Sequence, residues 1–89
     1  MNRRLKSTRQ FKRDLKLMQK RGKDPEKLWD IVEMILASVP LDVRYKPHRL
    51  SGNYASFWEC HIEPDWLLIW DDNEIRVMLV RTGTHSDLF

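Results

Sequence analysis

The sequence predicts an α+β domain in which a short strand and two helices precede a three-stranded antiparallel meander. Three observations support this fold class: helical spacing of apolar residues between residues 8 and 38, strand-like patterns between residues 57 and 81, and turn residues between these segments. We expect an antiparallel sheet of about four strands packed against a two-helix hairpin. Because the chain has 89 residues, we treat residues 1–89 as a single domain.

The first predicted helix follows a short candidate strand at residues 3–7. Ser7 or Thr8 offers a capping hydroxyl at its start, and it runs to about Arg21, where Gly22 ends it. Its apolar residues recur at helical spacing and form one stripe, made of Phe11, Leu15 and Met18.

The second predicted helix begins at residues 24–26, where aspartate, proline and glutamate supply an N-cap, a first helical position and a first-turn carboxylate. It runs to about Ser38, and Pro40 prevents its continuation. Two helices separated by so few residues are expected to form an antiparallel hairpin with a shared apolar surface.

The remaining residues supply the sheet that this surface covers. Residues 41–52 have the composition of a loop, and residues 57–63 then alternate, placing Glu59 and His61 on the face opposite Cys60. The following strands are the continuous apolar run 66–70 and the segment 75–81, which is rich in β-forming residues.

The composition excludes several classes of protein. The longest apolar run has five residues, far below the ~20 that a membrane span needs. No apolar stretch follows the basic N-terminus, and the single cysteine excludes an internal disulfide framework. A small protein of the cytoplasm, without membrane contact, is therefore expected.

Charge is distributed unevenly along the chain. Residues 1–27 contain eleven Lys and Arg against three acidic residues, whereas residues 28–89 contain five against ten. The basic segment suits a phosphate backbone, an acidic protein partner or simply a solvated helix face, and charge alone does not separate these.

The strand order predicts where chemically active side chains meet. In an up-down-up meander, the end of the first strand, the first turn and the end of the third strand lie at one edge. His61, Asp65 and His85 should therefore converge, with His48 in the preceding loop able to fold over the same edge and Arg81 nearby.

Two imidazoles and a carboxylate are suited to proton transfer near neutral pH. RNA cleavage by the neighbouring 2′-hydroxyl needs such a set: a base for that hydroxyl, an acid for the 5′-oxygen and a cation, such as Arg81, for the developing charge. Surface histidines without chemistry and a zinc site are the alternatives, although no Cys or His pair has typical zinc-ligand spacing. Trp66 and Trp70 are expected in the core, with Trp66 ambiguous because it adjoins the turn.

Three strings resemble a known family: YKPHRLSG at residues 45–52, ECHIEPDWLLIW at residues 59–70 and RTGTHSDLF at residues 81–89. They resemble the YafQ branch of the RelE/ParE toxin superfamily, with the RelE-like order β-α-α-β-β-β. The helical hairpin also agrees in pattern and length, so the resemblance spans essentially the whole chain.

The resemblance implies a toxin of a type II toxin–antitoxin pair that enters the A site of the 70S ribosome and cuts messenger RNA without a metal or cofactor. It implies a cognate antitoxin as partner, with operator DNA bound only through that antitoxin. The catalytic residues that it implies are His48, His61, Asp65 and His85, and those that hold substrate or shape the site are Trp66 and Phe89. We expect His85 to act as general acid, with His61 and Asp65 supplying or orienting the base, and His48 to assist proton transfer or bind phosphate.

Some positions depart from the family pattern. Trp58 stands where an arginine is common, Ser56 where a glycine is frequent, and Trp70 where a tyrosine is frequent. If the arginine normally contacts phosphate, this protein must use Arg81, Lys46 or the basic helix instead. The alternatives are a ParE-like inhibitor of DNA gyrase, an RNA-binding module without chemistry, and a toxin that has lost catalysis.

Overall fold

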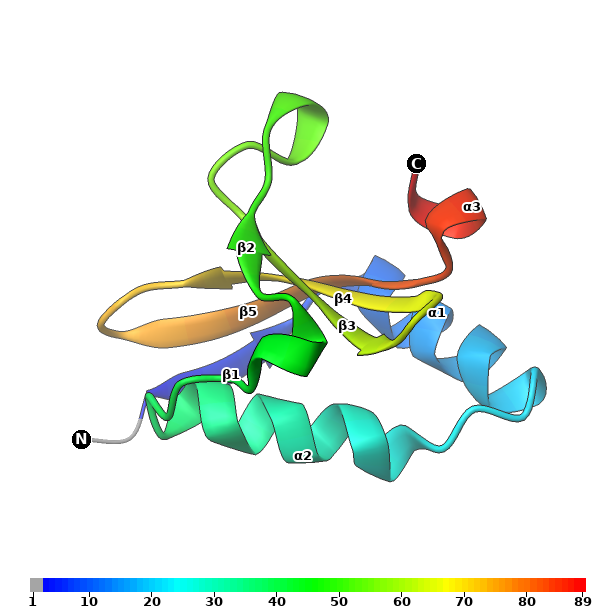
Figure 1. The fold of residues 1–89 in the computed structure, drawn as a ribbon, viewed down its shortest axis with the longest axis horizontal. Coiled ribbons are helices and arrows are strands. Elements are labelled where there is room, and N and C mark those ends of the chain that lie inside the picture. The colour runs from blue at the N-terminus through cyan, green and yellow to red at the C-terminus, as the bar shows by residue number, and fades with distance from the viewer. Residues whose placement is uncertain (1–2) are drawn as a thin grey trace.

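The structure is a computed structural model that describes residues 3–89. Its elements follow one another along the chain as shown in Figure 1. They are β1 (Arg4–Ser7), α1 (Arg9–Lys20), α2 (Pro25–Leu36), the 3-10 turn η1 (Val43–Tyr45), β2 (His48–Arg49), the 3-10 turn η2 (Gly52–Tyr54), β3 (Trp58–Glu63), β4 (Trp66–Asp72), β5 (Arg76–Gly83) and α3 (His85–Leu88).

The sheet confirms the α+β prediction and extends it from about four strands to five. Its order is β1-β5-β4-β3-β2, and every neighbouring pair is antiparallel except β1 with β5, which is parallel. The additional strand, β2, lies in the segment predicted as loop and makes only two residue pairs, His48 with Glu59 and Arg49 with Trp58.

Both predicted helices are confirmed, and local capping explains where they begin. The Thr8 hydroxyl accepts a hydrogen bond from the amide of Phe11, and the Asp24 carboxylate accepts one from the amide of Glu26. Pro25 then occupies the first turn of α2, where its missing N–H costs nothing. No helix within residues 3–89 is long and apolar enough to cross a membrane.

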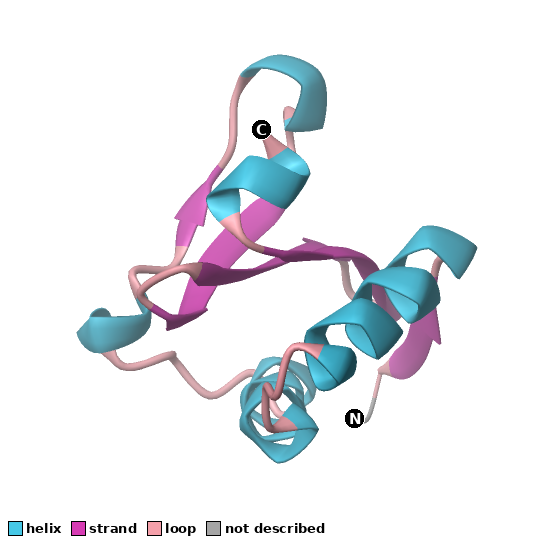
Figure 2. Cartoon of the chain, turned by 90° about the vertical axis from the view of Figure 1, so that its right-hand side faces the viewer, coloured by secondary structure: helices cyan, strands magenta, loops and turns pink. Residues whose placement is uncertain are grey.

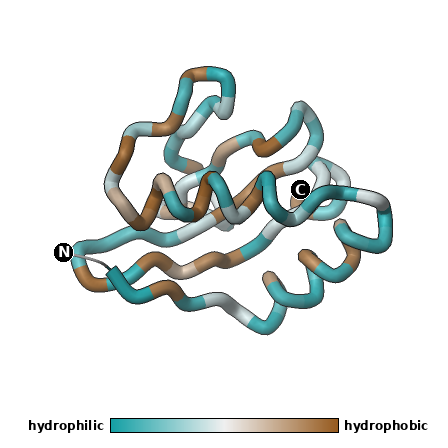
Figure 3. Tube along the Cα trace, turned by 90° about the horizontal axis from the view of Figure 1, so that it is seen from below, coloured by the Kyte–Doolittle hydropathy of each residue, from teal (hydrophilic) through white to brown (hydrophobic). Residues whose placement is uncertain are grey.

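The two helices cover one face of the sheet, and Figure 2 shows them together on that side. Alternate residues of β4 point to the two faces, so Leu68 packs toward the helices while Leu67 and Ile69 pack on the opposite face. In Figure 3 the colour of both helices changes repeatedly between hydrophobic and hydrophilic along the chain, as expected for a helix with one apolar side. We call the two sides the helix face and the open face.

A buried carboxylate joins α1 to β5. Asp14 is 7% exposed and accepts hydrogen bonds from Arg81 Nε at 2.7 Å, Arg81 Nη2 at 3.2 Å and the Thr82 amide at 3.2 Å. The hydrogen bond to Asp14 raises the pKa of the Arg81 guanidinium. These contacts hold α1 against the end of β5, at the edge where the order of the meander places the predicted site residues.

We expect Leu28→Ala to lower the free energy of unfolding by about 2–5 kcal/mol, because Leu28 is fully buried and its removal leaves a cavity. Urea unfolding monitored by tryptophan fluorescence measures the change. Leu17→Ala is the matched control, since Leu17 is 40% exposed on α1 and its loss should cost less than about 1 kcal/mol. Equal losses in both variants would contradict the packing described here.

Candidate active site

His85 and Asp65 form the tightest contact of the site. Asp65 lies in the turn between β3 and β4, and its Oδ1 is 2.5 Å from His85 Nδ1 and 2.9 Å from the His85 amide. These hydrogen bonds, from the amide first and the ring second, hold the pKa of the Asp65 carboxyl below its ordinary value. A carboxylate at Nδ1 favours the tautomer that has its proton on that nitrogen and leaves Nε2 outside this contact.

The position of His85 depends on how α3 begins. Thr84 and Asp87 form a reciprocal capping box, and Arg21 at the end of α1 binds Asp87 with its Nη1 at 2.8 Å. The Arg21 hydrogen bond, followed by the Thr84 amide, lowers the pKa of Asp87 to about 2. A Cβ at Gly83 would lie 3.0 Å from Asp87 Cβ, so glycine permits the close approach of strand and helix there.

His61 lies beside His85 on the open face. Its ring centroid is 5.5 Å from that of His85, with the two planes inclined by 62°. β3 therefore delivers one imidazole and α3 the other, and the two rings pack edge to face at the same end of the sheet.

Glu59 also lies in this cluster of histidines, although its place in the sequence did not indicate a candidate site residue. It is 5% exposed and lies two residues before His61 on the same face of β3. Its Oε1 is 3.3 Å from His48 Nε2 and 3.9 Å from His61 Nε2, while its Oε2 is buried without a hydrogen-bond partner among the described residues. The alternation in β3 places Glu59 on the same face as His61, and this could have been read from the sequence. The pairing of Glu59 with His48 is visible only in the structure.

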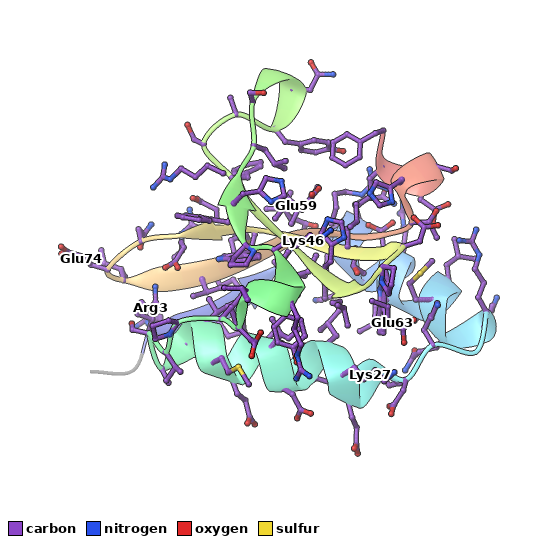
Figure 4. The ribbon with its side chains drawn as sticks, viewed as in Figure 1. Arg3, Lys27, Lys46, Glu59, Glu63 and Glu74 are labelled. Carbon is purple, nitrogen blue, oxygen red and sulfur yellow. The ribbon has the colours of Figure 1, made fainter. Side chains whose placement is uncertain are left out.

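His48 joins the cluster through β2. Its register partner across the sheet is Glu59, and its Nδ1 is 2.7 Å from the carbonyl oxygen of Lys46 (Figure 4). Lys46 itself is exposed and adopts a left-handed backbone conformation, with φ of 49°. Lys46 thus orients His48 through its backbone and leaves its ammonium free to meet a substrate.

The structure separates Trp66 from the other predicted site residues. Trp66 is fully buried on the helix face, where its Nε1 donates to the Thr82 hydroxyl at 2.9 Å, and that hydroxyl donates to the Leu67 carbonyl at 2.7 Å. It shapes the site by joining β4 to β5 and has no surface for substrate. Trp58, the departure from the family pattern, also lies on the helix face, stacked on Trp70 at 6.4 Å.

Arg81 and Phe89 line the open face near the cluster. Two nitrogens of Arg81 are bound to Asp14, and its Nη1 is 3.4 Å from the Tyr54 hydroxyl, so it is oriented rather than free. Phe89 is 65% exposed and packs edge-on against Tyr54, with ring centroids 5.6 Å apart. Both side chains are therefore placed to contact a bound substrate.

No group of three or more His, Cys, Asp or Glu within residues 3–89 is arranged to hold a metal ion. Cys60 is buried on the helix face, and burial raises the pKa of its thiol to about 12, so it is not a nucleophile near neutral pH.

Solved structures of the toxin YafQ have the same fold as this chain and a similar sequence. The crystal structure of YafQ from Escherichia coli strain BL21(DE3) matches with a TM-score of 0.93 and 36% identity, covering 98% of both chains. A chain of the E. coli DinJ-YafQ toxin-antitoxin complex matches with a TM-score of 0.91 and 37% identity, covering 100% of this chain and 99% of that one.

Sequence comparison narrows the class to one family. Residues 3–89 match the family described as "Bacterial toxin of type II toxin-antitoxin system, YafQ", and the chain belongs to it. The mRNA interferase toxin YafQ of E. coli K12 is 40% identical over 81 residues, covering 90% of this chain and 88% of that protein. The resemblance and the α+β fold class expected from the sequence are thus confirmed.

We expect the Asp65 carboxyl to titrate below its ordinary pKa, and His85→Ala to raise that pKa part of the way back. Part of the shift should remain, because the amide of residue 85 still donates to Asp65 after the ring is removed. Carboxyl carbon chemical shifts followed by NMR from pH 2 to 6 measure both values. An unchanged Asp65 pKa in the variant would contradict the contact with the His85 ring.

Proposed function

We propose that this protein is a ribosome-dependent endoribonuclease that cuts messenger RNA by attack of the 2′-hydroxyl on the neighbouring phosphate. The observation that carries the proposal is the convergence of His48, His61 and His85 with two carboxylates at one end of the open face. The E. coli relatives are mRNA interferase toxins by name, which supports the same substrate.

His85 is the general acid in this proposal. Asp65 accepts from Nδ1, so it orients the ring and stabilises the imidazolium that carries the second proton on Nε2. That proton passes to the 5′-oxygen as the phosphorus–oxygen bond breaks. The sequence predicts that Asp65 supplies or orients the base together with His61, whereas its contact with His85 supports a role beside the acid.

His61 is the general base, and Glu59 is the carboxylate that orients it. His61 removes the proton of the 2′-hydroxyl, whose oxygen then forms the new bond to phosphorus and yields a 2′,3′-cyclic phosphate. His48 contacts Glu59 from the other side and, with its second ring nitrogen held by the Lys46 carbonyl, assists proton transfer through that carboxylate. The acid and the base thus each have a separate carboxylate.

The charge that develops on the phosphate requires donors fixed in advance. Arg81 Nη1 and the Lys46 ammonium are the cationic donors beside the cluster, and Phe89 contacts the substrate at its rim. These side chains complete a reaction that proceeds by proton transfer and needs no metal ion.

The exposed basic face of α1 supports partners that carry negative charge. It is made of Lys12, Arg13, Lys16 and Lys20. This face would contact ribosomal RNA when the toxin enters the A site in the cytoplasm. An acidic segment of a cognate antitoxin would cover it in the inhibited complex, as a complex of relatives with the antitoxin DinJ suggests. Operator DNA would then be bound through the antitoxin.

We expect His85→Ala to lower cleavage by about 10²–10⁴-fold, the usual contribution of one general acid. Primer extension on a message under translation in a purified system measures the cuts. Wild type should cut at defined codon positions only with ribosomes and in the presence of EDTA.

Ser86→Ala is the matched control, because Ser86 is the exposed next residue of the same short helix. It should cut like wild type. If wild type leaves translated messages intact, the nuclease proposal is wrong, and inhibition of gyrase supercoiling by the same preparation would identify a ParE-like inhibitor instead.

We expect Glu59→Gln to lower cleavage by about 10²-fold or more, since removing the carboxylate that orients a catalytic histidine has an effect of at least this order. The substitution keeps the shape of the side chain, so the melting temperature should change little. Glu33→Gln, at an exposed position of α2, controls for loss of one negative charge. Full activity of Glu59→Gln would show that the buried carboxylate has no part in catalysis.

A further inference from the structure

A pocket adjoins the cluster of histidines. It has a volume of about 490 Å³, within the range of about 300–1,000 Å³ that small-molecule sites occupy. It lies between α2, η1 and the end of β3, and its walls are Lys27, Asp30, Ile31, Arg44, Tyr45, His61, Ile62, Glu63 and Pro64.

The short length of β2 creates this pocket. β2 pairs only with Trp58 and Glu59, so the second half of β3 has no strand beside it on that side. η1 approaches β3 there, and α2, which lies below both in Figure 1, contributes Lys27, Asp30 and Ile31 to the lining of the pocket.

His61 connects the pocket to the site of cleavage. Its ring lines the pocket and also lies 5.5 Å from the ring of His85. A phosphate bound against the outer edges of the two imidazoles would therefore place the adjoining nucleotide at the mouth of the pocket.

The walls have the chemistry that an unpaired base requires. The guanidinium of Arg44 lies over the ring of Tyr45, 4.7 Å from its centroid, and Arg44 Nη2 is 2.7 Å from the Tyr45 hydroxyl. Unpaired RNA bases stack on aromatic rings and on guanidinium planes. Arg44 forms no ion pair within residues 3–89, so its charge remains available to the RNA.

The acidic side chains of the pocket differ in their availability. Glu63 is held by Lys23 at 2.7 Å and Lys27 at 2.9 Å, and Figure 4 shows Lys27 below Glu63. Asp30 is exposed on α2 and has no such ion pair among the described residues. Its carboxylate is an acceptor suited to the exocyclic amino group of adenine, guanine or cytosine, which uracil lacks.

We propose that this pocket is the subsite for the nucleotide next to the cleaved bond, with its base stacking on the Arg44 guanidinium that the Tyr45 ring supports and with Asp30 selecting against uracil. The inference rests on the proposed nuclease function and adds to it a determinant of base preference. None of these three residues belongs to the catalytic cluster.

The test is to map the cut sites of several variants across many translated messages by sequencing the new 5′ ends. Tyr45→Leu and Arg44→Ala should each lower cleavage roughly 5- to 150-fold, as expected for loss of one stacked base. Tyr45→Phe should retain activity. Asp30→Ala should raise the share of uracil at the position next to the cut while cleavage elsewhere continues.

Arg49→Ala is the matched control, because Arg49 also lies over an aromatic ring, that of Trp58 at 5.1 Å, on the helix face away from the pocket. It should keep the wild-type rate and base frequencies. Melting curves for every variant separate loss of fold from loss of the subsite.

The outcomes distinguish the two proposals. If wild type cuts and the Arg44, Tyr45 and Asp30 variants match it in rate and base frequencies, the subsite is wrong and the nuclease assignment stands. If wild type cuts no message, both proposals fall together.

Discussion

Burial of β4 on both faces is the constraint on which the rest of the structure depends. Every residue from Trp66 to Trp70 is at most 3% exposed, so neither face of this strand can be left to water. The long helices cover one face, but the other is covered only by a small cluster around Leu67, Ile69 and Leu88. Covering that second face brings α3 back over the sheet, and the same packing sets His85 beside the β3-β4 turn.

Local signals in the sequence predicted the helices, but they did not predict the pairing between distant strands. Capping at Thr8 and at Asp24, with the spacing of apolar residues, defines α1 and α2 to within two residues. The parallel contact of β1 with β5 joins residues about seventy positions apart, and no local pattern encodes it. The burial of Asp14 could not be predicted for a similar reason, since its partner Arg81 is distant in the sequence and comes close to it only in the folded protein.

The site shows the same contrast between local patterns, which were predictable, and contacts between distant residues, which were not. The up-down-up order of the meander was sufficient to bring His61, Asp65 and His85 to one edge, because turns fix which strand ends meet. Which of these side chains touch depends on the start of α3, and the sequence alone grouped Asp65 with His61 rather than with His85, which it contacts. Glu59 was overlooked because a glutamate in an alternating strand normally faces water. An unsatisfied buried carboxylate is a local cost of the kind that proteins retain at functional sites.

The parallel pairing of β1 with β5 also fixes the order in which the molecule can assemble during synthesis. β1 leaves the ribosome first, yet its partner strand is made last of the five, and His85 follows that strand. Until then β1 has no strand beside it in the sheet, and His61 lacks the imidazole that packs against it. A nascent chain therefore completes the cluster of His61, Asp65 and His85 only when its last residues have been made.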